Sequence, residues 1–231
     1  SNSFTLLDEN GQPATSVPAK NPAGDVIGTY TLKVVDGKAT AVFTPTDKTY
    51  AGEVKPVTIQ AKDTNGTPVT TTYTPNITPV EPTGKPVTSE GAQGQPQEGT
   101  PTFTIPEGVT NASITSRKLV DPADPTNTPK DTVTLDGKGT FRIDGNGKVT
   151  FTPEPAYTGD VPSITVKATI TVTNDKGESA TIDSEAHYKP VIVPLELEKS
   201  PVKTRNLQGL EQKGTPTFTP GNPNVPIDED V

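Results

Sequence analysis

The sequence predicts an all-β protein made of tandem Ig-like β-sandwich repeats of about 110 residues each, joined by a Pro-rich linker. Three observations carry this prediction. Apolar and polar residues alternate over Ile164–Thr173, which is typical of a strand with one buried face. Turn residues recur every 8 to 12 positions or so, as in sandwich folds. Finally, the sequence repeats itself at a spacing the size of a domain.

Composition first decides whether the chain folds. Its 231 residues include 26 Pro and 20 Gly, and only 29% are hydrophobic, which borders on low complexity. The net charge is only −8, however, whereas disordered chains usually combine low hydrophobicity with strong charge repulsion. Thr is the most frequent residue and favours strands. We therefore expect many short strands joined by tight turns.

The same composition excludes several classes of function. Without Cys, the chain has no disulfide, zinc–thiolate site or thiol nucleophile, and its single His cannot build the usual transition-metal sites. The acidic pI of 4.7 argues against nucleic acid or an anionic membrane as partner. No apolar run approaches the roughly 20 residues of a membrane span.

Internal repeats are the most informative feature. The motif Gly99–Thr104 (GTPTFT) returns as Gly214–Thr219, 115 residues later. Two further matches, at spacings of 111 and 108, are given by Gly28-Thr29-Tyr30 with Gly139-Thr140-Phe141 and by Phe43-Thr44-Pro45 with Phe151-Thr152-Pro153. A period of this length indicates independent domains rather than a solenoid.

The repeats predict a division into domains in which the first domain is incomplete. The motif GTPTFT is missing ahead of the first repeat, so we expect that repeat to lack its first strand. An incomplete sandwich exposes a sheet edge, and an orphan strand can fill one, so strand exchange of 208–231 with another molecule is expected. The expected boundaries are an incomplete sandwich at 1–80, a Pro/Gly-rich linker at 81–98, a complete sandwich at 99–191, a second linker at 192–207, and the first strand segment of a following repeat at 208–231.

The strands are expected at matching places in both repeats. In the second repeat they are 139–143, 148–152 and 164–173, and in the first repeat 26–34, 39–44 and 57–62. Each Phe-Thr-Pro ends a strand, since Pro cannot donate to a ladder. The tyrosines that follow, Tyr50 and Tyr157, are expected to pack their rings against the rim of the core.

Acidic residues offer two weak metal candidates. The segment Asp144–Lys148 resembles the start of a calcium loop but lacks the distal acidic ligand, so a hairpin turn is favoured. A cadherin-like calcium site at a domain end stays open as an alternative, with no diagnostic spacing, from the carboxylates of Asp121, Asp124, Asp131, Glu178, Asp183 and Glu185.

Other candidates favour a structural interpretation. His187 has no second His, and a Ser, His and Asp arrangement around it cannot be told from chance. A Lys isopeptide crosslink from Lys33 or Lys167 is disfavoured because both lie on the polar phase of their strands. The chain has no Trp, so core packing is favoured over a sugar-binding aromatic platform. Glycosylation sequons begin at Asn65, Asn76 and Asn111, as chance allows at this Thr content.

Several motifs together resemble one family. They are the GTPTFT motif, Leu6–Pro13, Val26–Tyr30, Val42–Pro45, and Val57–Asp63 followed by Gly66–Val69. This sequence is similar to the CshA-type fibril repeats of Gram-positive, especially streptococcal, cell-wall adhesins, over nearly the whole chain. Residues 105–138 depart from the commoner form of the repeat.

The resemblance implies a function without catalysis. In that family the repeats build a surface fibril that projects an adhesive tip and is attached to peptidoglycan. We therefore expect no enzyme activity, no cofactor, and no catalytic, cofactor-binding or metal-binding residues. The expected role is a stalk in an extracellular, wall-anchored protein of a Gram-positive bacterium, with a part in virulence. Two alternatives stay open: the repeats could bind a host matrix protein themselves, or they could associate between fibrils.

Overall fold

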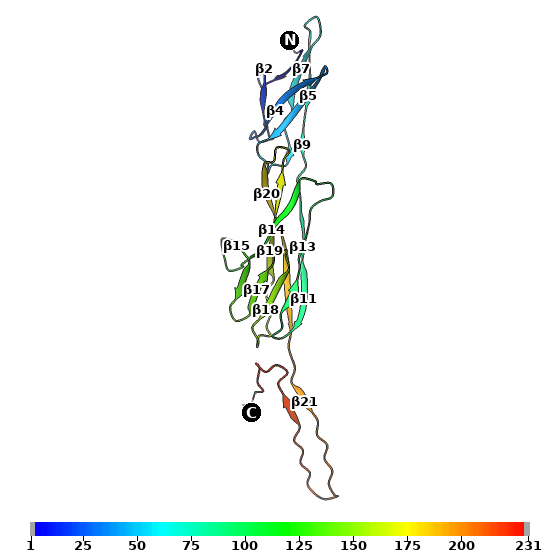
Figure 1. Cartoon of the computed structure of the whole chain (residues 1–231), viewed down its shortest axis with the longest axis vertical. Coiled ribbons are helices and arrows are strands. Elements are labelled where there is room, and N and C mark those ends of the chain that lie inside the picture. Colours follow the sequence, from blue (N-terminus) through cyan, green and yellow to red (C-terminus); the bar gives the residue numbers. More distant parts are fainter. Residues whose placement is uncertain (1–2, 229–231) are drawn as a thin grey trace. The chain divides into compact units, whose positions relative to one another are not determined.

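The computed structural model describes residues 3–228 and is all-β in this range (Figure 1). The predicted fold class is confirmed. The structure divides into two compact units. Unit 1 runs to Glu81 and also includes Ile105–Ser113 and Thr171–Ile182. Unit 2 comprises Pro82–Thr104, Ile114–Ile170 and the chain from Asp183 onwards.

Unit 1 contains two main antiparallel sheets. One has the strand order β2-β1-β7-β8 and the other β3-β4-β5, while the short strands β6 and β9 pair separately. The strands are β1 (Phe4–Leu7), β2 (Pro13–Ala14), β3 (Ser16–Lys20), β4 (Val26–Val35), β5 (Lys38–Pro45), β6 (Gly52–Glu53), β7 (Val57–Lys62), β8 (Pro68–Tyr73) and β9 (Asn76–Ile77).

Unit 2 repeats this plan with one more strand in each sheet. Its sheets have the orders β11-β20-β19-β14-β15 and β12-β18-β17-β16, and two hairpin-like pairs, β10 with β13 and β21 with β22, are separate. The strands are β10 (Thr83–Lys85), β11 (Val87–Ala92), β12 (Gln97–Gly99), β13 (Thr102–Thr104), β14 (Ala112–Val120), β15 (Pro129–Lys130), β16 (Thr132–Leu135), β17 (Gly139–Ile143), β18 (Val149–Pro153), β19 (Ile164–Thr173), β20 (Ser179–Val193), β21 (Glu198–Ser200) and β22 (Thr217–Thr219).

The strands with clean alternation form where the sequence predicts them. Strands β7 and β19 have the predicted bounds, and β19 buries every second residue from Ile164 to Ile170. Strands β5 and β18 end at Pro45 and Pro153, as expected for residues that cannot continue a ladder. Period-two patterning therefore fixes the strands of both central hairpins.

One turn recurs between the strands of both units. An Asp or Asn side-chain oxygen accepts the backbone N–H groups two and four residues on, and a Gly three residues on takes a positive φ. In the turn at Asp144, Oδ1 accepts from Asn146 and Lys148 at 2.9 Å each, and Gly147 has φ 87°. The same arrangement occurs at Asp8, Asp63 and Asn174. Asp144 thus makes the predicted hairpin turn.

Each unit has its own core, built around aromatic rings from both sheets. In unit 2, Phe141, Phe151 and Tyr188 are fully buried, with ring centroids 4.6 Å apart for the two Phe and 6.1 Å apart for Phe141 and Tyr188. In unit 1 the same cluster is formed by Tyr30, Phe43 and Tyr73. Tyr50 packs on the core of unit 1 and Tyr157 on that of unit 2, as predicted for the Tyr-x-Gly residues.

The two segments expected to be linkers contain β-strands. Residues 81–98 include β10, β11 and most of β12, and β11 joins a sheet by pairing in parallel with β20. The segment 192–207 contains the end of β20 and all of β21. Pro86 and Pro96 lie just outside β11 and β12, so they bound these strands rather than preventing them. The expected orphan strand within 208–231 is β22, which pairs with β21 of the same chain, and residues 1–2 and 229–231 lie outside the described residues.

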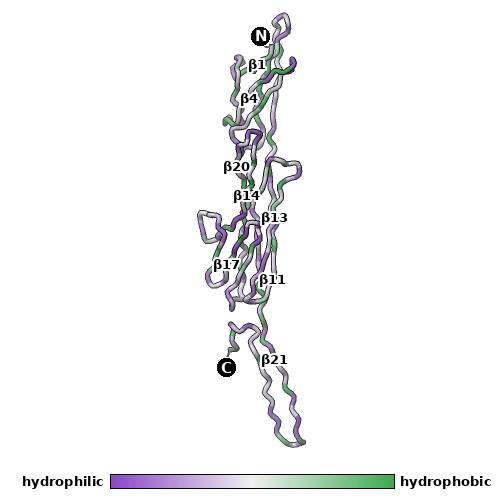
Figure 2. Tube along the Cα trace, in the orientation of Figure 1, coloured by the Kyte–Doolittle hydropathy of each residue, from purple (hydrophilic) through white to green (hydrophobic). Residues whose placement is uncertain are grey.

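Hydrophobic residues occur in short stretches along the strands and not in long runs. Figure 2 shows hydrophilic and hydrophobic positions alternating along the chain. Among residues 3–228 no helix is long and apolar enough to cross a membrane.

The aromatic cluster gives a direct test of the two-sheet core. Phe151→Ala removes a fully buried ring, and large-to-small changes of this kind cost about 3–5 kcal/mol. We expect the denaturant midpoint of unit 2 to fall accordingly, followed by circular dichroism. Val35→Ala, at a side chain 65% exposed, is the control and should stay close to wild type. A loss below about 1 kcal/mol for Phe151→Ala would contradict the core described above.

Candidate functional site

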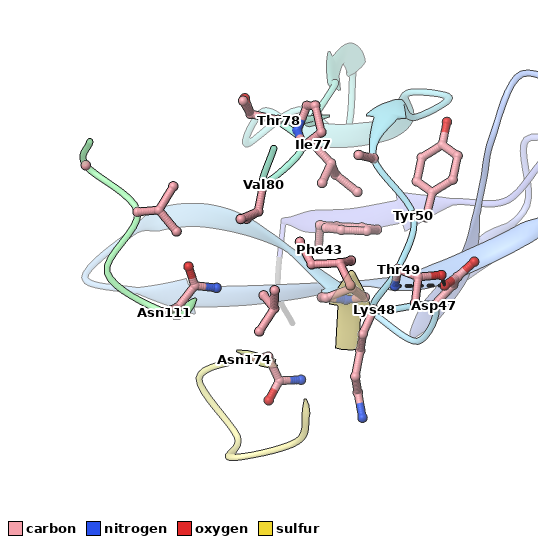
Figure 3. A pocket seen from close by; sticks show the side chains of 17 residues that line it. Phe43, Asp47, Lys48, Thr49, Tyr50, Ile77, Thr78, Val80, Asn111 and Asn174 are labelled. Carbon is pink, nitrogen blue, oxygen red and sulfur yellow. Dashed lines mark hydrogen bonds between the residues drawn. The ribbon is translucent and has the colours of Figure 1, made fainter. Parts of the chain in front are cut away.

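Unit 1 contains a cavity of about 620 Å³ (Figure 3). All 17 lining residues belong to this unit. They come from the end of β5 and the loop after it, from β9 and the residues that follow, and from the segments 105–113 and 171–182. Figure 3 shows Phe43 in the middle of the site, between Ile77 and Lys48.

The cavity wall is mainly apolar. Phe43 and Ile77 pack on the core of unit 1 and are only partly buried, so the cavity opens directly onto that core. The apolar lining residues are Phe43, Pro45, Ala51, Ile77, Pro79, Val80, Val109, Val172 and Ile182. Such a wall suits an apolar segment rather than a charged ligand.

Polar groups at the rim are paired with one another. Asp47 accepts hydrogen bonds from the Thr49 hydroxyl (2.7 Å) and amide (3.0 Å), which lower its pKa. Glu178 accepts from the Asn174 amide at 2.8 Å and lies 3.4 Å from Lys48 Nζ. The Asn174 hydrogen bond first, and then Lys48, lower the pKa of Glu178. Both carboxylates are therefore ionised near neutral pH; Glu178 forms a surface ion pair with Lys48, and Asp47 is hydrogen-bonded to Thr49.

The matching place in unit 2 is filled by the turn between β11 and β12. Gln93, only 3% exposed, donates from Nε2 to the Ala156 carbonyl at 2.9 Å and accepts from the Leu195 amide at 3.3 Å. A Cβ on Gly94 would lie 3.1 Å from the Pro155 carbonyl oxygen, so this turn fits closely. By sequence spacing, Thr49 and Val80 of the cavity correspond to Ala156 and Leu195.

The carboxylates considered for calcium are bound to lysines. Lys130 Nζ lies 3.0 Å from Asp121 and 3.4 Å from Asp124, and Lys118 lies 2.5 Å from Asp131. The hydroxyl and amide of Thr126 are the main cause that lowers the pKa of Asp124 to about 2. Within the described part of the chain, no three His, Cys, Asp or Glu residues are grouped so as to hold a metal ion.

The remaining carboxylates follow the same pattern. Asp183 forms an ion pair with Lys167 at 2.8 Å, and Glu185 adds a smaller favourable charge interaction with that lysine. The pair raises the pKa of Lys167, chiefly through the hydrogen bond to Asp183. Lys33 lies opposite Thr40 in the β4–β5 ladder. Both lysines considered for isopeptide crosslinks are thus residues of strands, Lys33 in β4 and Lys167 in β19.

The other candidates lie on strands and turns. His187 Nδ1 lies 3.2 Å from the Thr165 hydroxyl on the neighbouring strand. Among the sequons, Asn65 lies in the Asp63 turn, Asn76 begins β9, and Asn111 donates from its amide to the Thr173 carbonyl at 3.2 Å.

Two buried glutamines were missed by the sequence reasoning. Gln97, 4% exposed, accepts from the Ser89 hydroxyl at 2.8 Å and donates to the Val191 carbonyl at 2.9 Å. Gln97 thus attaches the β11–β12 segment to β20, and the Gln93 side chain attaches it to Ala156 after β18 and to Leu195 after β20. The signal was available, since Gln93, Gly94 and Gln97 return as Gln208, Gly209 and Gln212.

This geometry defines a class of protein: tandem β-sandwich repeats, in the second of which strands of a preceding hairpin join both sheets. A family model described as "Surface adhesin CshA repetitive domain" matches residues 1–77 and again 79–192. The chain belongs to this family. The family is one of surface adhesin repeats, which indicates a non-enzymatic structural protein. No curated protein matches the chain significantly.

Among solved structures, the matches include fragments made of several Ig or cadherin domains. One is the N-terminal four Ig domains of Dscam1 isoform 1.9, with 13% identity, TM-score 0.27, and coverage of 84% of this chain and 46% of that one. Extracellular cadherin domains 3–6 of Protocadherin Gamma B2 are 12% identical with a TM-score of 0.27, and the match covers 75% of this chain and 40% of that one. Human CDH23 EC21-23 is 14% identical with a TM-score of 0.25, and the match covers 81% of this chain and 56% of that one. The chain thus spans about half the length of these structures.

The buried Tyr30 in the core of unit 1 predicts that the stability of this unit depends on alkaline pH. Tyr30 is 1% exposed and donates to the Lys55 carbonyl at 2.7 Å. Burial, and then the nearby Tyr73, raise the pKa of Tyr30 to about 12. An unfolded Tyr ionises near pH 10, so between about 10 and 12 the unfolded chain binds fewer protons than the folded one. We expect the stability of unit 1 to be intact below pH 10 and to fall as the pH rises toward 12.

The measurement is denaturant unfolding across this pH range, compared with Tyr30→Phe, which keeps the ring without the ionisable hydroxyl. The variant should lose part of the pH dependence. An identical alkaline slope in both proteins would show that Tyr30 does not carry the effect.

Proposed function

We propose that the chain is a section of a structural stalk in a bacterial surface adhesin, which holds an adhesive tip away from the cell wall. Two tandem copies of the family repeat support this proposal. The polar groups at the cavity rim are already paired, and no catalytic arrangement surrounds His187. The location we propose is extracellular, on a Gram-positive cell wall.

One observation carries the mechanical role. In unit 2 the strand near the start of the repeat, β11, pairs in parallel with the last strand, β20, over six residue pairs from Val87↔Tyr188 to Ala92↔Val193. Tension along the chain enters at the beginning of β11 and leaves at the end of β20. In a parallel pair such tension acts along both strands in opposite directions, so it shears all hydrogen bonds of the pair together.

Side chains reinforce this parallel pair. The Ser89 hydroxyl lies 2.7 Å from the Tyr188 hydroxyl, and Gln97 donates to the carbonyl of Val191. The backbone N–H of Gln93 donates to the Val193 carbonyl at 2.8 Å, which extends the pair by one more bond. Tyr188, Gln93 and Gln97 are buried and Ser89 is half-buried, so water does not compete freely for the hydrogen bonds that these residues make. The pair is suited to resist extension.

Single-molecule pulling in two directions tests this role. The chain has no Cys, so paired handles can be introduced at Glu81→Cys with Leu197→Cys, which shears β11 from β20, or at Gln95→Cys with Leu197→Cys. The second pair pulls both strands from the same end and opens their hydrogen bonds one at a time. We expect a severalfold higher rupture force for the first pair.

All three handle residues are exposed, so the fold of unit 2 should be unchanged in both variants. Equal rupture forces in the two directions, or extension without a discrete unfolding event, would overturn the stalk proposal. Saturable binding of a host matrix protein by the same chain would instead favour the ligand-binding alternative.

A further inference from the structure

One dipeptide recurs in the turns of this chain. Asn followed by Gly occurs at Asn10–Gly11, Asn65–Gly66 and Asn146–Gly147, and an Asp two residues before each Asn begins the turn. All three asparagines are exposed, and they lie outside both cores and outside the cavity of unit 1. The stalk role proposed above makes no use of them.

Asn is one of the thermolabile residues, and Asn followed by Gly is its most reactive context. The Gly backbone nitrogen attacks Cγ of the Asn side chain and a new C–N bond forms. The bond from Cγ to Nδ2 breaks, and ammonia leaves with the proton of the Gly N–H. Water then opens the cyclic imide at either of its carbonyls, which gives Asp or isoaspartate. Gly favours the attack because no Cβ obstructs its nitrogen.

The attacking nitrogen must first give up its proton. An amide nitrogen shares its lone pair with the neighbouring carbonyl, so the neutral N–H group is a poor nucleophile. A hydrogen bond from that N–H to a fixed acceptor holds the proton in place and fixes the peptide plane. The reactivity of each Asn-Gly pair therefore depends on the partner of its Gly N–H.

In all three turns the Gly N–H donates to the carbonyl of the Asp that begins the turn. Each Gly has a positive φ, between 75° and 87°, which places it in the conformation that closes the turn. The nitrogen needed for the attack is thus engaged in each turn. The N···O distances are 3.0 Å for Gly147 with Asp144, 3.0 Å for Gly66 with Asp63, and 2.9 Å for Gly11 with Asp8.

The Asp side chain fixes the same turn through further hydrogen bonds. In the turn at Asp63, Oδ1 accepts from the amides of Asn65 at 2.9 Å and Thr67 at 2.8 Å. The Asp63 amide also donates to the Thr67 carbonyl at 3.1 Å. These bonds hold the peptide planes on both sides of the Asn-Gly pair. For the Gly nitrogen to reach the Asn side chain, several hydrogen bonds must open together.

A fourth turn shows that the carboxylate charge is not required. Asn174 Oδ1 accepts from the amides of Lys176 and Glu178 at 3.0 Å each, and Gly177 donates to the Asn174 carbonyl at 3.0 Å. Lys176 takes the place of the Asn here, so this turn contains no Asn-Gly pair. The turn thus needs a side-chain oxygen at its first position and not a negative charge.

We propose that Asn10, Asn65 and Asn146 are deamidation sites that the folded turn keeps closed and that unfolding opens. In the unfolded chain the Gly N–H is bonded only to water, so the attack proceeds. Isoaspartate adds a carbon atom to the main chain, so the Gly N–H no longer reaches the carbonyl that closes the turn. Prolonged unfolding of a unit therefore becomes a permanent chemical change. This inference concerns the turns and does not depend on the stalk role.

The first experiment compares deamidation of the full chain when folded in buffer and when unfolded in guanidinium chloride. Both samples are kept in heavy-oxygen water at mildly alkaline pH, below the range in which Tyr30 ionises, and are followed by peptide mapping with mass spectrometry. We expect all three sites to react about tenfold faster or more in the unfolded chain, because the hydrogen bonds of the turn no longer have to open. Each product should carry one heavy oxygen atom from the water that opens the imide.

Equal rates at Asn65 and Asn146 in the folded and unfolded chains would overturn the proposal. A product without heavy oxygen would show that the change preceded the incubation, and a folded sample in which all product is of this kind supports protection by the turn.

The second experiment removes the side-chain acceptor from one turn at a time. Asp63→Ala should raise the rate at Asn65 severalfold in the folded chain and leave the rate at Asn146 unchanged, since Asp144 still holds that turn. Asp144→Ala should do the reverse. Each variant thus contains the control for the other.

Asp63→Asn keeps a side-chain oxygen, as at Asn174, and creates no new Asn-Gly pair because Thr64 follows. It should protect Asn65 as well as the wild type does. A rate at Asn65 that Asp63→Ala leaves unchanged, or that Asp63→Asn raises as much, would overturn protection by the turn. Equal acceleration at Asn10, which lies in the same unit, would assign the protection to the fold of the whole unit instead.

The third experiment tests the consequence for folding. Chains are held in guanidinium chloride for increasing times and then diluted, and the fraction that regains the native circular dichroism is measured. We expect this fraction to fall in step with the isoaspartate content. A variant with Asn10→Gln, Asn65→Gln and Asn146→Gln should keep refolding, because Gln forms the corresponding larger ring slowly. Wild-type refolding that is independent of isoaspartate content would refute the permanent change.

Discussion

The structure of unit 2 depends on one constraint: its aromatic core is covered by a preceding hairpin that adds an outer strand to both sheets. In unit 2 that hairpin covers Phe151 and Tyr188, which are fully buried. Two buried glutamines attach it through hydrogen bonds to Ala156 and Val191. A buried polar side chain is stabilising only when its partners are present, so Gln93 and Gln97 permit one placement of the hairpin.

The same hairpin connects the stability of the core of unit 2 with the proposed mechanical role. It stands at the start of its repeat but pairs with β20, the last strand, so the core is closed by the element on which tension acts first. A second hairpin, in which β21 pairs with β22, follows β20.

The central strands could be predicted from the sequence because their signals are local. Ile164–Thr173 alternates without interruption, and the residues at Asp144 and Asp63 hydrogen-bond their own backbone, so neither needs the rest of the fold. The same holds for the hairpin turn at Asp144, whose carboxylate oxygen accepts hydrogen bonds from two backbone amides. The lysine pairing of Asp121 and Asp124 depends on Lys130 from another strand, so spacing alone did not reveal it.

The sequence by itself determined the all-β class, the period near 110 residues, the strands of the central hairpins and the family, since each of these rests on short-range patterns or on recurrence. Only the tertiary structure decided what 81–98 does. Its Val-Thr-Ser-Glu-Gly-Ala segment has weak alternation and adjoining prolines, and becomes β11 because Tyr188–Val193, about 100 residues away, offers a free edge. An edge strand takes its stability from its neighbour, so its own residues reveal little of it.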